Sequence, residues 1–130
     1  MKREIQSAIR VGDKARLDSA LAEYKSHDSY VNELFMKACK FNDSMTVDSL
    51  IKFGVDINQP ESIRTPLQWA VTLNHYEIVK LLLDSGADAS LGNPPPLHIA
   101  VGMSRANIVR LLLNYHADLK KLDVSLLFIV

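Results

Sequence analysis

The chain of 130 residues contains one cysteine, Cys39, and this scarcity excludes an internal disulfide framework. It has no excess charge of either sign, because 15 basic residues balance 15 acidic ones. A neutral chain favours neither nucleic acid nor an anionic membrane as its partner. No apolar run approaches the roughly 20 residues of a membrane-spanning helix, and Met1–Glu4 do not begin like a signal peptide. We therefore expect an intracellular, cytoplasmic protein without membrane insertion, with the nucleus as an alternative compartment.

Sequence motifs that carry enzymatic chemistry are also missing. The chain has no glycine-rich phosphate loop, no paired Cys or His cluster, and neither a G-x-S-x-G nor an H-E-x-x-H motif. For Cys39, an inert buried thiol is a better interpretation than a redox or nucleophilic role. We expect His98 to bond the backbone rather than a metal, since it shows no ligand spacing with His27, His75 or His116. The sequence thus predicts no catalytic activity, no catalytic or metal-binding residue and no cofactor.

What the sequence does contain is a repeated segment. The stretches that align thirty residues apart are Thr65–Ala70 with Pro95–Ala100, Asn74–Leu83 with Ser104–Leu113, and Ser85–Asp88 with Tyr115–Asp118. Weaker copies of the same pattern precede them, at offsets of 32 and then 30 residues. Because a unit of this size cannot bury its apolar face alone, the repetition indicates a stacked array.

These units resemble the ankyrin repeat family, whose pattern is T-P-L-H-x-A, then G-H-x-E-V-V-K-L-L-L, then G-A-D. The resemblance covers nearly the whole chain and implies an all-α solenoid of stacked helix–turn–helix units joined by fingers. It also implies a single domain, in which each unit packs on its neighbours. The predicted units are an N-terminal helix pair at 1–26, repeats at 27–58, 59–89 and 90–119, and the start of a further unit at 120–130.

Local signals place the helix ends within the repeat at 59–89. Thr65 is expected to cap the first helix and Pro66 to occupy its first turn, where a missing N–H costs nothing. Asn74-His75 should break the chain between the two helices. Gly86 should supply the left-handed residue that ends the second helix.

The departures from the family pattern predict short fingers. The units are spaced 30 or 32 residues apart, whereas the family's repeat has about 33. Asn93–Pro96 places three prolines in a row, so this finger cannot form a full hairpin ladder. His116 replaces a helix-ending glycine and is expected to adopt a left-handed conformation at some cost.

The resemblance implies binding of another protein through the concave groove, which first helices and fingers line. An apolar residue follows the small-residue pair of each first helix, as Val11, Phe41, Leu73 and Met103. Two interpretations are open: these side chains pack between repeats, or they form an apolar strip for a partner. Packing is favoured for Ile99. With basic residues nearby, the groove suits an amphipathic or acidic segment, and its candidate binding residues are Arg10, Val11, Lys40, Phe41, Arg64, Trp69, Thr72, Leu73 and Met103.

Two further hypotheses concern the end of the chain and one asparagine. Leu126–Val130 are apolar and begin a unit without a second helix, which predicts docking on the preceding repeat and self-association through the remaining apolar surface. A structural or assembly module is therefore the alternative function.

Leu50 and Asp56-Ile57-Asn58 resemble the pattern of ankyrin repeats hydroxylated on asparagine. The competing interpretation is that Asn58 bonds its own turn.

Overall fold

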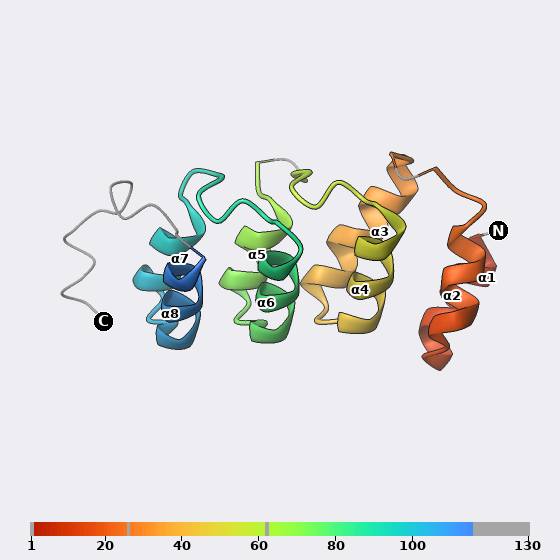
Figure 1. Cartoon of the computed structure of the whole chain (residues 1–130), viewed down its shortest axis with the longest axis horizontal. Coiled ribbons are helices and arrows are strands. Elements are labelled where there is room, and N and C mark those ends of the chain that lie inside the picture. Colours follow the sequence, from red (N-terminus) through yellow and green to blue (C-terminus); the bar gives the residue numbers. More distant parts are fainter. Residues whose placement is uncertain (1, 26, 62, 116–130) are drawn as a thin grey trace.

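The computed structural model describes residues 2–25, 27–61 and 63–115, and in this part of the chain all regular secondary structure is helical. Within these described residues, four helix pairs follow one another along a single axis (Figure 1). Each predicted unit from 1–26 to 90–119 contains one pair, and the all-α solenoid is confirmed. The helices are α1 (Lys2–Val11), α2 (Lys14–Leu21), α3 (Ser29–Lys40), α4 (Ser44–Phe53), α5 (Pro66–Thr72), α6 (Tyr76–Asp84), α7 (Pro96–Gly102) and α8 (Ala106–Asn114).

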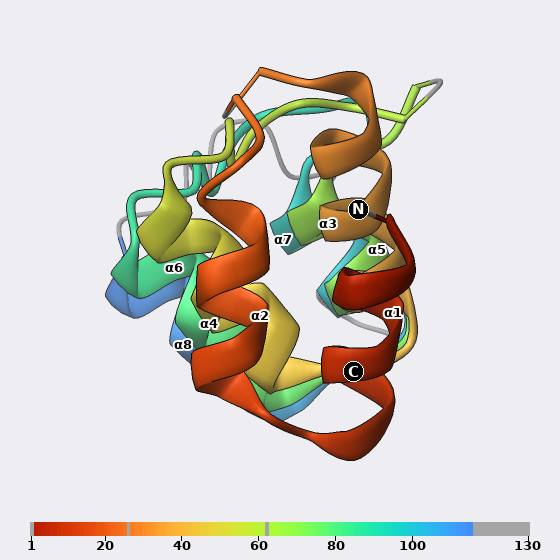
Figure 2. The same ribbon diagram turned by 90° about the vertical axis from the view of Figure 1, so that its right-hand side faces the viewer.

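The odd-numbered and even-numbered helices form two layers. Viewed along the stack, α1, α3, α5 and α7 lie on one side and α2, α4, α6 and α8 on the other (Figure 2). Apolar residues at helical spacing face the space between the layers. In α6, the stripe of Ile78, Val79, Leu82 and Leu83 is buried as its spacing requires. The core therefore runs the length of the stack, and each pair buries its apolar face against its neighbours.

Side chains just outside the helices explain where they begin. The carboxylates of Asp13 and Asp43 accept hydrogen bonds from backbone N–H groups in the first turns of α2 and α4. At α5, the Thr65 side chain accepts from the Gln68 N–H, while the Gln68 side chain accepts from the Thr65 N–H. This reciprocal capping box, with Pro66 in the first turn, confirms the predicted start of α5.

The turn inside each pair has one left-handed residue at an equivalent position. Its φ angle is 74° at Gly12, 59° at Asn42, 61° at Asn74 and 57° at Ser104. The break predicted at Asn74-His75 is thereby confirmed. Glycine adopts this conformation freely, asparagine tolerates it, and serine does so at a cost.

This difference gives the first prediction. Ser104→Gly should stabilise the fold by up to about 1 kcal/mol, because it relieves the left-handed strain while only partly loosening the unfolded chain. Thermal unfolding of the variant and the parent chain measures the effect. Asn74→Gly is the matched control and should gain less, since asparagine already tolerates the conformation. A Ser104→Gly protein that melts below the parent contradicts the prediction.

The fingers are short, as the offsets predicted. In the finger between α4 and α5, Glu61 and Arg64 exchange two backbone hydrogen bonds of 2.9 and 3.2 Å, which close a tight hairpin turn. The finger before α7 is held differently: the side-chain amide of Gln68 donates to the carbonyl of Pro94 at 2.7 Å. Gly92, with φ 115°, lies so close to this amide that a Cβ atom would overlap it. Gly86 follows α6 with φ 95°, which confirms the predicted helix end.

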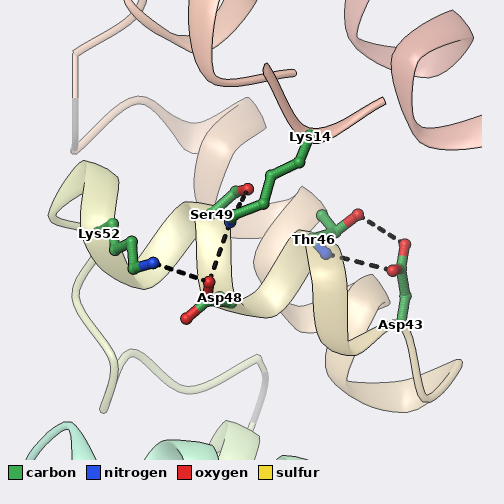
Figure 3. A network of polar contacts seen from close by, with 6 residues as sticks. All are labelled: Lys14, Asp43, Thr46, Asp48, Ser49 and Lys52. Atoms are coloured by element: carbon green, nitrogen blue, oxygen red, sulfur yellow. Dashed lines mark hydrogen bonds and ion pairs between the residues drawn. The ribbon is translucent and has the colours of Figure 1, made fainter. Parts of the chain in front are cut away.

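The N-terminal pair is attached mainly through the even-numbered layer. Helix α2 packs on α4, and α3 packs on α5 as α5 does on α7, but α1 makes no contact of that extent with α3. Lys14 connects the two units, since its Nζ lies 2.9 Å from Asp48 Oδ2 and donates to Ser49 Oγ at 2.8 Å (Figure 3). Lys52 Nζ lies 3.1 Å from the same Asp48 oxygen.

This network makes stability depend on pH. The hydrogen bond from Lys14 holds the pKa of the Asp48 carboxyl below its ordinary value, and Lys52 adds to the effect. A lowered folded-state pKa means that the ionised group stabilises the fold above its unfolded pKa, about 3.9, and that this contribution is lost as the pH falls through the folded pKa. Asp48→Asn should therefore destabilise the protein at neutral pH, and its difference from the parent should shrink as the pH falls below the unfolded pKa of about 3.9.

Urea unfolding of both proteins across that range measures the difference in midpoint. Asp84→Asn, at the exposed end of α6, is the control and should show no such convergence. A difference between Asp48→Asn and the parent that stays constant from neutral to acidic pH contradicts the assignment.

Candidate functional site

A row of exposed apolar side chains follows the ends of the odd-numbered helices. The exposed fractions are 65% for Val11, 74% for Phe41, 42% for Leu73 and 44% for Met103. We call the surface that carries this row, together with the adjoining fingers, the groove face. Phe41 is thus mostly exposed and Leu73 partly so, and binding of a partner by these residues stays a prediction. Ile99 is buried, as the packing interpretation for that residue requires.

The middle of the groove face is built around Trp69, which is half-buried. Lys40 Nζ lies 4.6 Å from the centre of its ring, and the Arg64 guanidinium carbon lies 5.4 Å from it. Both distances are within the range of cation–π attraction. Lys40 also pairs with Glu61 of the hairpin finger. The structure therefore brings together three of the predicted site residues, from α3, from α5 and from the finger between α4 and α5.

Thr72, another predicted site residue, is engaged in structural hydrogen bonds. Its hydroxyl donates to the carbonyl of Gln68 at 2.8 Å and accepts from Arg64 Nη1 at 3.1 Å. The Thr72 backbone carbonyl accepts from Arg105 Nη2 at 3.1 Å. Thr72 therefore positions Arg64 beside Trp69 and connects its repeat to the next one.

A staple between repeats was not anticipated from the sequence. His75 Nδ1 lies 3.0 Å from the carbonyl oxygen of Cys39, and since a carbonyl only accepts, Nδ1 carries the proton. Arg105 makes the corresponding contact to Thr72 one repeat later. No side-chain hydrogen bond of His98 is made to the described residues, so the backbone bond expected for His98 stays a prediction. The sequence signal for these contacts was that His75 and Arg105 occupy equivalent positions, each just after a left-handed turn residue.

A pocket of about 480 Å³ opens between α1 and α3. Its apolar lining includes Ile9, Leu34 and Ala38, and Phe41 stands at its edge. The predicted site residue Arg10 lies here too. Sequence reasoning missed the pocket, because it depends on how far α1 stands from α3 and no local pattern records that separation.

Burial accounts for the titration of two side chains near this face. Cys39 is fully buried, and desolvation raises the pKa of its thiol to about 12. A thiol with such a pKa is protonated at neutral pH, so the inert interpretation of Cys39 is favoured. Desolvation also raises the pKa of Tyr30, and the neighbouring Tyr24 contributes to the rise. Lys2 Nζ lies 4.6 Å from the centre of the Tyr30 ring.

The Asn58 side chain connects two fingers. The side-chain Oδ1 of Asn58 accepts a hydrogen bond from the backbone N–H of Asp88 at 3.0 Å. The backbone N–H of Asn58 donates to Asp56 Oδ1 at 3.1 Å. The Asn58 side chain therefore bonds the neighbouring finger, and its own turn is closed by the Asp56 side chain instead. The modification of Asn58 remains a prediction. His116 and the apolar segment Leu126–Val130 lie outside the described residues.

Neither a metal site nor a membrane-spanning helix is found in the part of the chain that the structure describes. There, no three side chains of His, Cys, Asp or Glu gather as ligands for a metal ion. None of the helices described is long and apolar enough to cross a membrane.

Stacked helix–turn–helix pairs, short fingers and staples between repeats define a solenoid repeat protein. A family model described as ankyrin repeats (3 copies) matches residues 7–93 and 35–123. The chain belongs to the ankyrin-repeat family, as its sequence pattern predicted. Members of this family generally act as protein–protein interaction modules and are typically not enzymes.

Several known proteins are similar to this chain over part of their length. Zygote-specific protein 3 of Chlamydomonas reinhardtii is 41% identical over 80 residues, covering 59% of this chain and 22% of that protein. Putative ankyrin repeat protein FPV031 of Fowlpox virus (strain NVSL) is 39% identical over 95 residues, covering 67% and 28%. Ankyrin repeat domain-containing protein 40 of Mus musculus is 36% identical over 75 residues, covering 56% and 20%. The chain therefore matches less than a third of each relative's length.

Proposed function

We propose that this chain is a non-catalytic adaptor whose groove face binds a segment of another protein. The observation that carries the proposal is the exposure of Val11, Phe41, Leu73 and Met103 at equivalent places in four consecutive units. Large apolar side chains exposed in a regular row are typical of surfaces that a partner covers. Aromatic residues among them are the kind that dominate binding energy.

The charges beside this row support an amphipathic or acidic segment as the partner. Lys40 and Arg64 flank Trp69, and Arg10 is exposed at the end of α1. A guanidinium or ammonium group beside apolar surface favours a partner that places carboxylates next to apolar side chains. An intracellular, cytoplasmic location fits a buried, reduced Cys39, and fluorescence imaging of a tagged chain tests that location.

Affinity and stability of the same variants test this function. A pulldown with the parent chain and with a Phe41→Ala, Leu73→Ala double variant should identify proteins that only the parent retains. For such a partner, Phe41→Ala alone should weaken binding by roughly 2 kcal/mol or more, because a truncated aromatic anchor loses its pocket contacts. Lys80→Ala, exposed on α6, should change the affinity little.

Thermal unfolding of each variant completes the test. If Phe41→Ala and Leu73→Ala bind normally once folded, the groove face is not the binding surface and the proposal fails. The proposal also fails if the double variant retains every protein that the parent chain captures.

The alternative function is a structural or assembly module that associates through Leu126–Val130. It rests on five consecutive apolar residues in the sequence. Light scattering over a range of concentrations distinguishes the two functions. Self-association that is lost when Leu126–Val130 are replaced by serine supports assembly, whereas a monomer at all concentrations excludes it.

A further inference from the structure

The step from the first helix pair to the second lacks the staple of the later steps. His75 and Arg105 each reach back to a carbonyl near the end of the preceding odd-numbered helix. The residue at the equivalent position in the earlier pair is Asp43, and an ionised carboxylate has no hydrogen to donate to a carbonyl. Both Asp43 oxygens instead accept from Thr46, at 3.2 Å from its N–H and 2.6 Å from its hydroxyl (Figure 3).

The missing staple coincides with the pocket between α1 and α3. Helix α1 does not pack on α3 as α3 packs on α5, and a volume of about 480 Å³ is left open there. Ile9, Leu34 and Ala38 contribute an apolar lining, while Phe41 at the edge is the most exposed member of the apolar row. The space is large enough for one aromatic or long aliphatic side chain, whose burial would remove apolar surface of both molecules from water.

The unpaired charges around this pocket are mainly positive. Arg10 and Lys37 line it and are exposed, and neither takes part in an ion pair within the described residues. Of the two acidic lining residues, Asp43 is compensated by the first turn of α4, whose N–H and hydroxyl groups it binds. Glu33 is then the remaining acid beside two cations. A ligand with negative charge next to its apolar group complements this arrangement.

We propose that the pocket between α1 and α3 is the anchor point of the groove face, and that it takes one large apolar side chain from a partner segment with acidic residues beside it. This inference rests on the proposed function and specifies its position and chemistry. The apolar side chain contacts Ile9, Leu34 and Phe41, while its acidic neighbours pair with Arg10 and Lys37. The rest of the segment continues along the row toward Leu73.

The probe for this site is a displayed library of random short peptides, selected on the intact chain. Selected peptides should share an aromatic or long aliphatic residue adjacent to Asp or Glu. Arg10→Glu with Lys37→Glu should weaken a selected peptide by about tenfold or more, as should Phe41→Ser. All three residues are exposed, so the variants are expected to fold, and thermal unfolding checks this. Lys80→Glu on α6 is the matched charge control and should leave the affinity unchanged.

The outcomes separate this inference from the proposed function. Peptides that are lost with Leu73→Ser and Met103→Ser but retained by the Arg10, Lys37 and Phe41 variants overturn the pocket and leave the groove face as the binding surface. Enrichment of Lys or Arg beside the apolar residue overturns the stated chemistry. Binding insensitive to all of these variants overturns both proposals. A failure to select any peptide, with self-association that Phe41→Ser abolishes, assigns the pocket to a second copy of the chain and also overturns the inference.

Discussion

Phe35→Ala should destabilise the protein by about 3 to 5 kcal/mol, the largest effect we expect from a single substitution. The Phe35 side chain is 1% exposed and belongs to the core that α3 shares with its neighbours. Truncation to alanine removes its buried surface and leaves a cavity that surrounding helices fill only in part. Because small domains have a total stability of about 5 to 15 kcal/mol, the loss is a large fraction of the whole.

The matched control for Phe35 lies at the end of the same helix. Phe41 is 74% exposed, so Phe41→Ala should change the free energy of unfolding by less than about 0.5 kcal/mol. Urea unfolding followed by circular dichroism measures both variants against the parent. Equal destabilisation by the two substitutions would show that Phe41 is packed in solution, and would count against the groove face as well.

Gln68→Leu should cost about 2 to 4 kcal/mol, although leucine has a similar size and is apolar. The Gln68 side chain is fully buried, and it accepts from the Thr65 N–H at 2.8 Å while donating to the Pro94 carbonyl at 2.7 Å. Leucine would leave both backbone groups without these partners. The variant should therefore lose one of the two hydrogen bonds of the capping box, that of the Thr65 N–H, together with the attachment of the following finger.

Gln68→His is the informative comparison. Histidine occupies the equivalent position in the next repeat as His98, and an imidazole retains one donor and one acceptor. This variant should lose less stability than Gln68→Leu in urea unfolding. Hydrogen exchange at the Thr65 amide should be fast in Gln68→Leu and remain slow in the parent. A Gln68→Leu protein as stable as the parent, with its Thr65 amide still protected, would show that the two side-chain hydrogen bonds of Gln68 contribute nothing to stability.

Local patterns were sufficient for the helices and their ends. Three of these local features depend only on residues within one turn of each other, so the sequence alone predicts them. They are the capping box at Thr65, the glycine after α6 and the left-handed break at Asn74. The exposure of Phe41 was left open, because an apolar residue at that place in a repeat can pack or face solvent. The hydrogen bond from His75 to the Cys39 carbonyl was not foreseen, since it depends on which carbonyl lies within reach.

The sequence by itself determined the repeat, the all-α solenoid, the family and the row of apolar residues, because the same local pattern of residues recurs in each unit. Only the tertiary structure decided what happens between units. The contacts between units join residues that lie 26 to 36 positions apart or belong to different elements. They are the backbone hydrogen bonds of His75 and Arg105, the bond from Gln68 to Pro94, and the cations beside Trp69. At the pocket between α1 and α3, Asp43 caps its own helix and has no hydrogen to donate to a carbonyl of α1, whereas the later steps carry the hydrogen bonds of His75 and Arg105.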